Sequence, residues 1–223
     1  MTLLESFSFD TIKNFDNHIE LSVPNYKHIW ELISKMSSYF ITPDSNIYDI
    51  GCSTSLGLKQ LNLNTNILDT HFIGYDISDN MLKGVRQTNN FHILKKDITE
   101  PTVKFENASL ILSIFTIQFI NINKRLEILQ RIYNGLNYGG AFIISEKVYL
   151  SRGEFQDIFT FSYYDFKQES FSNEEIMKKQ SDLRFIMKPL TEKENISLFK
   201  AAGFKKIETF FQSLNFKAWI LIK

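Results

Sequence analysis

The stretch IYDIGCSTSLGLKQL, residues 47–61, contains a strand-like apolar run, a turn of small residues and the start of a helix. The chain has only nine glycines, yet small residues fill every position from 51 to 55, shortly after Asp49. A plain connection between a strand and a helix needs only one or two conformationally permissive residues. A turn that is small across its whole width is typical of a loop that binds a ligand, because larger side chains would keep the ligand away from the backbone.

Strand-like and helix-like apolar patterns alternate along most of the chain. Helical spacing is clearest at residues 26–40 and 123–136, and we expect residues 137–140 to end the second helix. The strand candidates are residues 47–50, 72–75, 91–94, 110–114 and 141–145. Alternation of this kind predicts an α/β fold, in which crossover helices join parallel strands on both faces of one sheet.

Two regions depart from this alternation. The tail has strand-like runs on either side of residues 212–215, too close together for a crossover helix, so we expect an antiparallel pair at the sheet edge. Residues 150–190 are rich in aromatic side chains and contain two helix-like pieces, the second capped by Ser172 or Asn173. This insertion is either an ordinary helical excursion over the sheet or a lid or dimer arm at the edge where ligands bind.

Composition sets the outer limits on function. The 223 residues carry 25 lysines and arginines against 25 aspartates and glutamates, so no overall field would attract nucleic acid or an anionic membrane. One cysteine, no apolar run of membrane-spanning length and no secretory signal predict a cytoplasmic protein. We expect a single domain over residues 1–223, with residues 1–45 as an N-terminal helical cap. The four histidines lack metal-ligand spacing, so we expect no metal and a small-molecule substrate.

Acidic residues follow successive strand candidates. Asp76 ends the run FIGYDIS, 25 residues after Gly51, where a carboxylate can accept hydrogen bonds from a ribose diol. Asp97 ends HILKKDI after the next strand, where it can meet an adenine amino group. The turn lacks the G-x-G-x-x-G spacing of a dinucleotide site and has no basic residue before Lys59. An adenosine without phosphates fits better, and S-adenosylmethionine is the common ligand of that kind; we expect Cys52 to be a small core residue rather than a reactive thiol.

Several short motifs between residue 22 and the C-terminus point to one family. They are SVPNY, YDIGCS, YDIS, KDI, FTIQFI, IYNGLNYGGAFIISEK, DFK and FFQSLNFKAWILIK. Through them the chain resembles the class I S-adenosylmethionine-dependent methyltransferases, specifically the carboxy-S-adenosylmethionine synthases of tRNA wobble-uridine modification. The resemblance implies a Rossmann-like, seven-stranded, mostly parallel sheet with an antiparallel C-terminal strand, and a homodimer. It also implies cofactor contacts from Tyr26, Gly51, Cys52, Ser53, Asp76, Ile77, Asp97 and Ile98.

Two positions depart from the family pattern. Ile114 stands where the family has an asparagine, just before FT-x-QF at the cofactor site. Gln180 stands where the family has an arginine that, as the resemblance implies, pairs with the extra carboxylate of the product. A neutral amide cannot replace a guanidinium in strength or in fork geometry. Arg184, one helical turn further on, is a candidate to compensate.

Three reactions fit these residues. The resemblance implies that prephenate loses carbon dioxide, which a sulfonium ylide captures, but the missing arginine weakens the cationic clamp that this reaction needs. Methyl transfer to a small molecule tolerates Ile114 and Gln180 and is the favoured interpretation. The third is an intramolecular displacement on the cofactor's own aminobutyrate chain, releasing methylthioadenosine, with Tyr163 and Tyr164 holding the sulfonium by cation–π contact unless they serve only in packing. A protein that only binds the cofactor is the non-enzymatic alternative.

Overall fold

The computed structural model describes residue 12 and residues 14–223 of the chain. Its centre is one sheet with the strand order β3-β2-β1-β4-β5-β8-β7, and β6 pairs with the end of β5. Strands β1 to β5 run parallel, whereas β8 is antiparallel to both of its neighbours. The predicted mostly parallel Rossmann-like sheet is therefore confirmed. The strands are β1 (Asn46–Ile50), β2 (His71–Asp76), β3 (Phe91–Lys95), β4 (Ala108–Ile114), β5 (Leu136–Tyr149), β6 (Leu190–Thr191), β7 (Lys206–Ser213) and β8 (Phe216–Ile222).

The C-terminal pair of strands is antiparallel, as predicted, but only β7 forms the edge of the sheet. Strand β8 lies between β5 and β7. Its sequence FKAWILI is apolar at nearly every position, and five of its seven residues are buried. A strand with that composition is typical of the interior of a sheet whose two faces are covered by helices. Strand β7 forms the edge of the sheet instead, and it has more exposed residues than β8.

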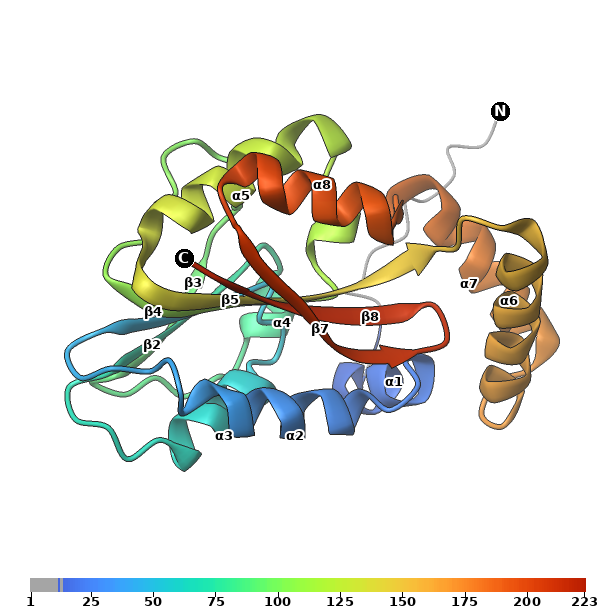
Figure 1. The fold of residues 1–223 in the computed structure, drawn as a ribbon. Helices are drawn as coiled ribbons and strands as arrows, with labels where there is room; N and C mark the ends of the chain where they lie inside the picture. Colours follow the sequence, from blue (N-terminus) through green and yellow to red (C-terminus); the bar gives the residue numbers. More distant parts are fainter. Residues whose placement is uncertain (1–11, 13) are drawn as a thin grey trace.

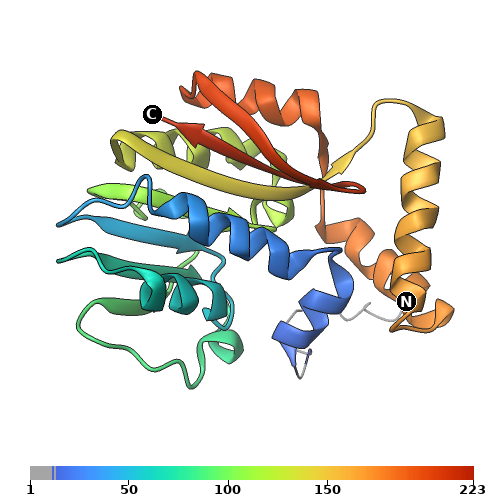
Figure 2. The same cartoon turned by 60° about the horizontal axis from the view of Figure 1, so that its bottom comes forward.

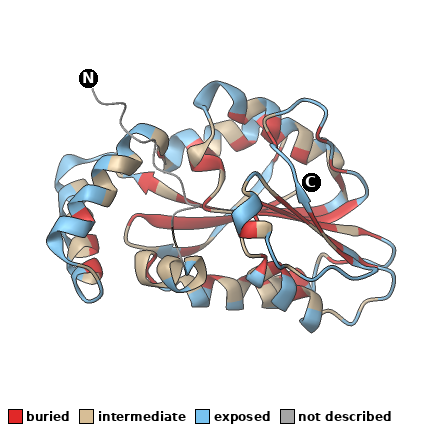
Figure 3. Cartoon of the chain, turned by 180° about the vertical axis from the view of Figure 1, so that it is seen from behind, coloured by how far each residue is buried: buried red, intermediate tan, exposed pale blue. Residues whose placement is uncertain are grey.

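Helices cover both faces of the sheet (Figure 1). Helices α5 and α8 lie on one face, where Ile132 and Phe199 belong to one buried apolar cluster, and α2 and α3 lie on the other, where Ile29 and Leu58 belong to a second cluster. The buried residues in Figure 3 run along the strands between these two layers. The helices are α1 (Phe15–Ser22), α2 (Tyr26–Ser37), α3 (Leu56–Asn64), α4 (Asp79–Leu82), the 3₁₀ helix η2 (Ile117–Phe119), α5 (Ile122–Gly135), α6 (Gly153–Gln168), α7 (Asn173–Ile186) and α8 (Glu192–Ala202).

Helix α5 ends earlier than the sequence pattern indicates. It stops at Gly135, and the residues expected to form its terminating loop, 137–140, belong to β5 instead. Leu136 adopts an extended conformation while its N–H still bonds to Ile132 O, and it pairs with Ala108 of β4. The chain therefore passes from helix to strand without a separate loop.

The insertion forms helices α6 and α7, which stand beside the sheet at the end where the parallel strands finish (Figure 2). Ser172 caps α7: its hydroxyl accepts from Glu175 N–H while the Glu175 carboxylate accepts from Ser172 N–H, a reciprocal capping box. The capping position predicted for this helix is therefore confirmed, whereas the role of the insertion as a dimer arm stays a prediction. No helix in the described part of the chain is both long and apolar enough to span a membrane.

Candidate active site

A large cavity lies at the carboxyl ends of the parallel strands, the edge where open α/β sheets bind their ligands. Its volume is about 1250 Å³, above the range of about 300–1,000 Å³ that is usual for one small ligand. Twelve of the thirteen residues that the sequence indicates for the site line it, and Arg184 does not. They are Tyr26, Gly51, Cys52, Ser53, Asp76, Ile77, Asp97, Ile98, Ile114, Tyr163, Tyr164 and Gln180.

The turn after β1 is held in a conformation that requires a small residue. Gly51 has a φ of 72°, in the left-handed region, and a Cβ there would lie 2.2 Å from Thr116 Oγ1. The N–H groups of Gly51 and Cys52 both donate to Tyr75 O, at 2.7 and 3.0 Å, which fixes the turn against β2. Helix α3 begins immediately afterwards at Leu56. The small residues therefore keep open a surface of backbone at the cavity wall, as the sequence predicts.

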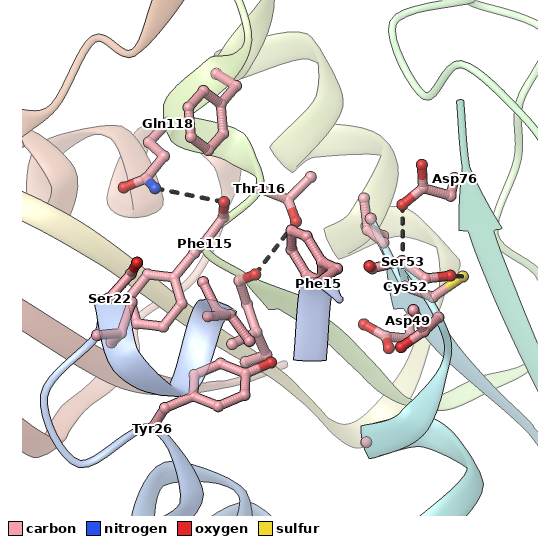
Figure 4. A pocket seen from close by; sticks show the side chains of 18 of the residues that line it. Phe15, Ser22, Tyr26, Asp49, Cys52, Ser53, Asp76, Phe115, Thr116 and Gln118 are labelled. Atoms are coloured by element: carbon pink, nitrogen blue, oxygen red, sulfur yellow. Dashed lines mark hydrogen bonds between the residues drawn. The ribbon is translucent and has the colours of Figure 1, made fainter. Parts of the chain in front are cut away.

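Asp76 at the end of β2 faces this turn (Figure 4). Its Oδ2 accepts from Ser53 N–H at 2.8 Å and its Oδ1 accepts from Ser78 N–H at 2.9 Å. Because each carboxylate oxygen has about two lone-pair sites, each can still accept a hydrogen bond from a ribose hydroxyl. The backbone contacts fix the orientation of the carboxylate before any ligand arrives.

The neighbouring strand end supplies the surroundings of a planar base. Asp97 Oδ1 accepts from Thr99 N–H at 2.8 Å, which orients the carboxylate while its second oxygen can accept from an amino group. Ile77 is 67% exposed and lines the cavity, whereas Ile98 is buried beside it in the wall. An exposed apolar side chain beside an oriented carboxylate suits adenine. Asp49, Gly51, Ser53, Asp76, Ile77 and Asp97 define what we call the nucleoside half of the cavity.

Two buried groups lie under the turn. Burial and, secondarily, the nearby Asp76 carboxylate raise the pKa of Asp49 to about 7. Burial likewise raises the pKa of the Cys52 thiol, which is 6% exposed and accepts a hydrogen bond from Ser55 Oγ at 3.4 Å. Cys52 is thus a buried, protonated residue of the loop, as its sequence context predicts. No cluster of three or more potential metal-ligating histidine, cysteine, aspartate or glutamate side chains occurs in the described ranges.

The nucleoside half fits S-adenosylmethionine. Oriented carboxylates are present for the ribose and the adenine, and the turn carries no basic side chain that would attract phosphates. A third acid lies at the wall, where Asp16 of α1 accepts from Thr54 Oγ1 at 2.5 Å. Carboxylates at Asp16, Asp49 and Asp76 suit a ligand with a sulfonium and an ammonium group. Asp76 and Asp97 would hold the nucleoside, and the acids nearer β1 would face its cationic part.

A second part of the cavity is cationic, and this part was not predicted. It is lined by Lys147 of β5, Lys167 of α6, Lys179 of α7 and His18 of α1, together with Tyr163, and we call it the lysine chamber. Lys147 Nζ lies 4.6 Å from the centroid of the Tyr163 ring, and Lys167 Nζ lies 5.8 Å from the same centroid. The aromatic ring therefore supports two lysines by cation–π contact.

The basic groups of the lysine chamber repel one another. Burial and then Lys167 lower the pKa of Lys147 to about 8, and the same two causes lower that of Lys179 to about 8. Burial, Lys179 and Lys167, in that order, lower the pKa of His18 to about 4. Among the described residues neither Lys147 nor Lys167 has a carboxylate within salt-bridge distance. Buried like charges that lack a close counter-ion are unfavourable, so the chamber is suited to an anion.

Tyr163 and Gln180 both reach the chamber, but Arg184 lies outside it. The Tyr163 hydroxyl donates to Ser22 O at 2.9 Å, which ties α6 to α1, and its ring already contacts two lysines. Arg184 is exposed, bonds to Ser181 Oγ at 3.4 Å and stacks 5.3 Å from the Phe185 ring centroid. Gln180 and its neighbour Lys179 on α7 thus line the cavity, whereas Arg184 does not. The motifs SEK and DFK, which contain Lys147 and Lys167, were the signal available in the sequence.

The turn after β4 forms part of the cavity wall. Phe115 has a φ of 59°, a costly conformation for an aromatic residue, and such strain is concentrated at functional sites. Its N–H donates to Ser145 O at 2.7 Å, so β5 holds the strained residue in place. In Figure 4, Phe115 and Gln118 lie on one side of the cavity, whereas Asp49 and Asp76 lie on the other.

Comparisons with known proteins agree with this geometry. Residues 47–140 match the model of a methyltransferase domain. A carboxy-S-adenosyl-L-methionine synthase of Staphylococcus epidermidis is 40% identical over 225 positions, which cover 97% of this chain and 95% of that protein. The synthase of Shewanella sediminis is 31% identical over 230 positions, covering 99% and 94%.

A solved structure supports the fold. Human N-acetylserotonin methyltransferase in complex with S-adenosylmethionine superposes on 88% of this chain with a TM-score of 0.57 at 13% identity. This chain spans 53% of that protein, about half its length, so the likeness concerns the fold alone.

These observations identify the protein as a transferase that uses S-adenosylmethionine or a derivative of it. The cavity has oriented acids for the nucleoside, and the domain model covers the strands that carry them. Because a relative 40% identical aligns with almost the whole chain, the chain belongs to the carboxy-S-adenosyl-L-methionine synthase family.

Proposed function

We propose that the protein is a carboxy-S-adenosyl-L-methionine synthase, which transfers a carboxylate from an anionic donor such as prephenate to S-adenosylmethionine. The observation that carries the proposal is the lysine chamber, a set of buried cations in the cavity that also holds the nucleoside half. A dicarboxylate donor would give Lys147, Lys167 and Lys179 a close counter-charge, which Lys147 and Lys167 lack within salt-bridge distance among the described residues, although Glu175 attracts Lys167 from further away. The names of the relatives point to the same product.

The residues divide the task between the two halves. Bound S-adenosylmethionine supplies the methyl carbon that receives the carboxylate. Asp76 and Asp97 hold its nucleoside, and Asp49 opposes its positive charge. The lysines hold the donor's carboxylates in a chamber that excludes water, where electrostatic contacts are stronger than in solvent.

The overall reaction balances without a further reactant. In the donor, the bond between the ring and its carboxylate breaks, and a new bond joins that carbon to the methyl carbon. The methyl proton leaves with the donor's hydroxyl as water, and the donor ring becomes aromatic. The bonding pair of the broken bond enters the ring and expels the hydroxide, so the ring carboxylate loses its charge as carbon dioxide, and the lysine chamber would hold the carboxylate that remains on the donor.

Methyl transfer to a small molecule is the second candidate, and Gln180 is the observation that favours it. The family arginine is missing there, and a methyl transfer does not need it. Under this alternative the lysines would hold an anionic acceptor, and the product would be S-adenosylhomocysteine.

One incubation separates these candidates. The protein is incubated with S-adenosylmethionine, alone and with prephenate labelled with carbon-13 in the ring carboxylate, and the products are identified by mass spectrometry. We expect a carboxylated cofactor that carries the label and forms only with the donor. S-adenosylhomocysteine with no carboxylated product would support methyl transfer, and methylthioadenosine formed without the donor would support the intramolecular reaction. Either result would overturn the proposal.

A further inference from the structure

Gln118 of η2 lines the cavity on the side opposite Asp76, and both ends of its side-chain amide have protein partners (Figure 4). The side chain is 4% exposed. Its Oε1 accepts from Lys147 N–H at 2.8 Å, and its Nε2 donates to Phe115 O at 3.4 Å. The amide is therefore engaged in holding the strained turn after β4 and the backbone of the residue that carries a chamber lysine.

The backbone of Gln118 connects the same point to the insertion. Its carbonyl oxygen accepts from Lys188 N–H at 2.8 Å and from Arg125 Nη2 at 3.0 Å. Arg125 Nη2 also donates to Lys188 O at 2.7 Å, and Arg125 Nε donates to Ile120 O at 2.9 Å. Lys188 is the second residue after the end of α7, the helix that carries Lys179. One residue thus joins β5, which supplies Lys147, to the end of the helix that supplies Lys179.

A buried carboxyl group lies beneath this junction. Glu146 is 2% exposed and faces the Arg125 guanidinium and the backbone N–H groups of Ile117 and Gln118. Burial, opposed by Arg125, raises the pKa of Glu146 to about 8. Arg125 is 1% exposed, and its buried guanidinium is stabilised by hydrogen bonds to the carbonyl oxygens of Gln118, Ile120 and Lys188. Arg125 and Glu146 therefore both hold the backbone of Gln118 in place through hydrogen bonds.

We propose that Gln118 is a positioning residue for the anionic second substrate. By binding the N–H groups of Lys147 and Lys188, it fixes Lys147 relative to the lysines of the insertion, and the spacing of these cations sets the affinity for the donor. The inference rests on the proposed function for the identity of that donor. The contacts of Gln118 do not depend on the proposed function, because all of them lie within the protein. A charged group displaced by about 1 Å can lose much of its effect on a bound substrate.

The test replaces Gln118 by methionine, which keeps the length of the side chain and removes the amide. We expect the KM for prephenate to rise about tenfold, while the Kd for S-adenosylmethionine measured by calorimetry stays within about twofold. The matched control is Gln156→Met. Gln156 Oε1 accepts from Leu150 N–H at 2.9 Å and its Nε2 donates to Thr160 Oγ1 at 3.0 Å, but its side chain does not line the cavity. The control should leave both constants unchanged.

A double-mutant cycle separates positioning from a direct role. If Gln118 acts through Lys147, then Gln118→Met should change the KM by less than about twofold in a Lys147→Met background. Effects that multiply in the double variant would overturn the proposal. Thermal melting shows whether the single variant folds, and Gln118→Asn, whose shorter amide cannot reach Lys147 N–H, provides a second variant if it does not.

A readout without turnover keeps this inference apart from the proposed function. The lysines are dimethylated with carbon-13 formaldehyde, and the Lys147 signal, assigned by its absence in Lys147→Met, is titrated by NMR. We expect its pKa to change in Gln118→Met from about 8, because a shift of the Lys147 backbone alters both the burial of its ammonium group and the distance of that group from Lys167. An unchanged pKa would contradict positioning whatever reaction occurs. A changed pKa in a protein that makes no carboxylated product would support positioning and contradict only the proposed function.

Discussion

The nucleoside half of the cavity takes its functional groups from consecutive strand ends of one sheet, whereas the lysine chamber takes them from four elements spread over the chain. Asp49, Asp76 and Asp97 lie in or just after β1, β2 and β3. The chamber lysines come from β5, α6 and α7, and its histidine comes from α1. The first half is therefore local in sequence, and the second exists only after the insertion has packed against the sheet.

The two halves also carry opposite charge. Acids surround the place where a cationic cofactor would lie, and lysines surround the place where an anionic donor would lie. Each half alone holds like charges close together, which raises the pKa of Asp49 and lowers those of Lys147 and Lys179 in addition to the larger effect of burial. Substrate binding would relieve this repulsion in both halves. The comparison predicts that changes in one half alter the affinity for one substrate only.

The largest effect is expected for Asp76→Ala. This change removes the acceptor for the ribose and for the N–H groups of Ser53 and Ser78, so we expect S-adenosylmethionine to bind at least about 100-fold more weakly, as measured by calorimetry. Asp79→Ala is the control, because Asp79 is three residues away and pairs with Lys95 at the exposed surface. Equal affinities of the Asp76 variant and the native protein would contradict the ribose assignment.

The corresponding change in the chamber is Lys179→Gln. Removing one of three cations should raise the KM for prephenate about tenfold and leave the Kd for S-adenosylmethionine unchanged. Lys178→Gln serves as the control, because this neighbour on α7 is exposed and does not line the cavity. A similar KM in the two variants would indicate that the chamber does not bind the donor.

The same difference explains how much of the site could be predicted. The turn at Gly51 and the acids at Asp76 and Asp97 were recognised because strand, turn and acid follow one another along the chain, and the carboxyl ends of parallel strands meet at one edge. The chamber lysines lie far apart in sequence, and no periodicity indicates that they meet. The equal totals of basic and acidic residues also conceal their separation into two halves.

The fold was also predictable from patterns that are local in the sequence, and the errors of that prediction concern single positions. Apolar alternation indicated five parallel strands and the antiparallel tail, because each strand needs its own apolar residues. Helix α5 was predicted one residue too long, since pairing of Leu136 with β4 ended it at Gly135. Arg184 was weighed as a substitute for the family arginine on helical spacing alone, but that spacing does not show which side of α7 faces the cavity.

Opposite charge in the two halves predicts opposite pH dependence. Asp49, with a pKa of about 7, loses its charge as pH falls, so the affinity for S-adenosylmethionine should fall below about pH 7. Lys147 and Lys179, with pKa values of about 8, lose their charge as pH rises, so the affinity for prephenate should fall above about pH 8. Where one proton is involved, the affinity should fall by about tenfold per pH unit on the acidic side for S-adenosylmethionine and on the alkaline side for prephenate. We expect a bell-shaped pH profile of kcat/KM with its maximum between these values.

Asp49→Asn tests the acidic limb separately. The amide does not titrate, so the fall in S-adenosylmethionine affinity below about pH 7 should disappear, while the alkaline fall in prephenate affinity should remain. Calorimetric titrations across the pH range measure both limbs. An acidic limb that persists in this variant would assign it to another group.

The smallest effect at neutral pH is expected for Gln180→Arg, which restores the family's residue beside the lysines. With three lysines already charged, a guanidinium should lower the KM for prephenate by less than about tenfold, because like-charge repulsion offsets part of the gain. The gain should grow above about pH 8, since Lys147 and Lys179 lose their charge there and arginine does not. Steady-state kinetics at pH values on either side of the lysine pKa would show this as a flattened alkaline limb. If the variant instead weakened prephenate binding equally at every pH, Gln180 would not face the donor, and the lysines would have to provide the anion site without any contribution from that position of α7.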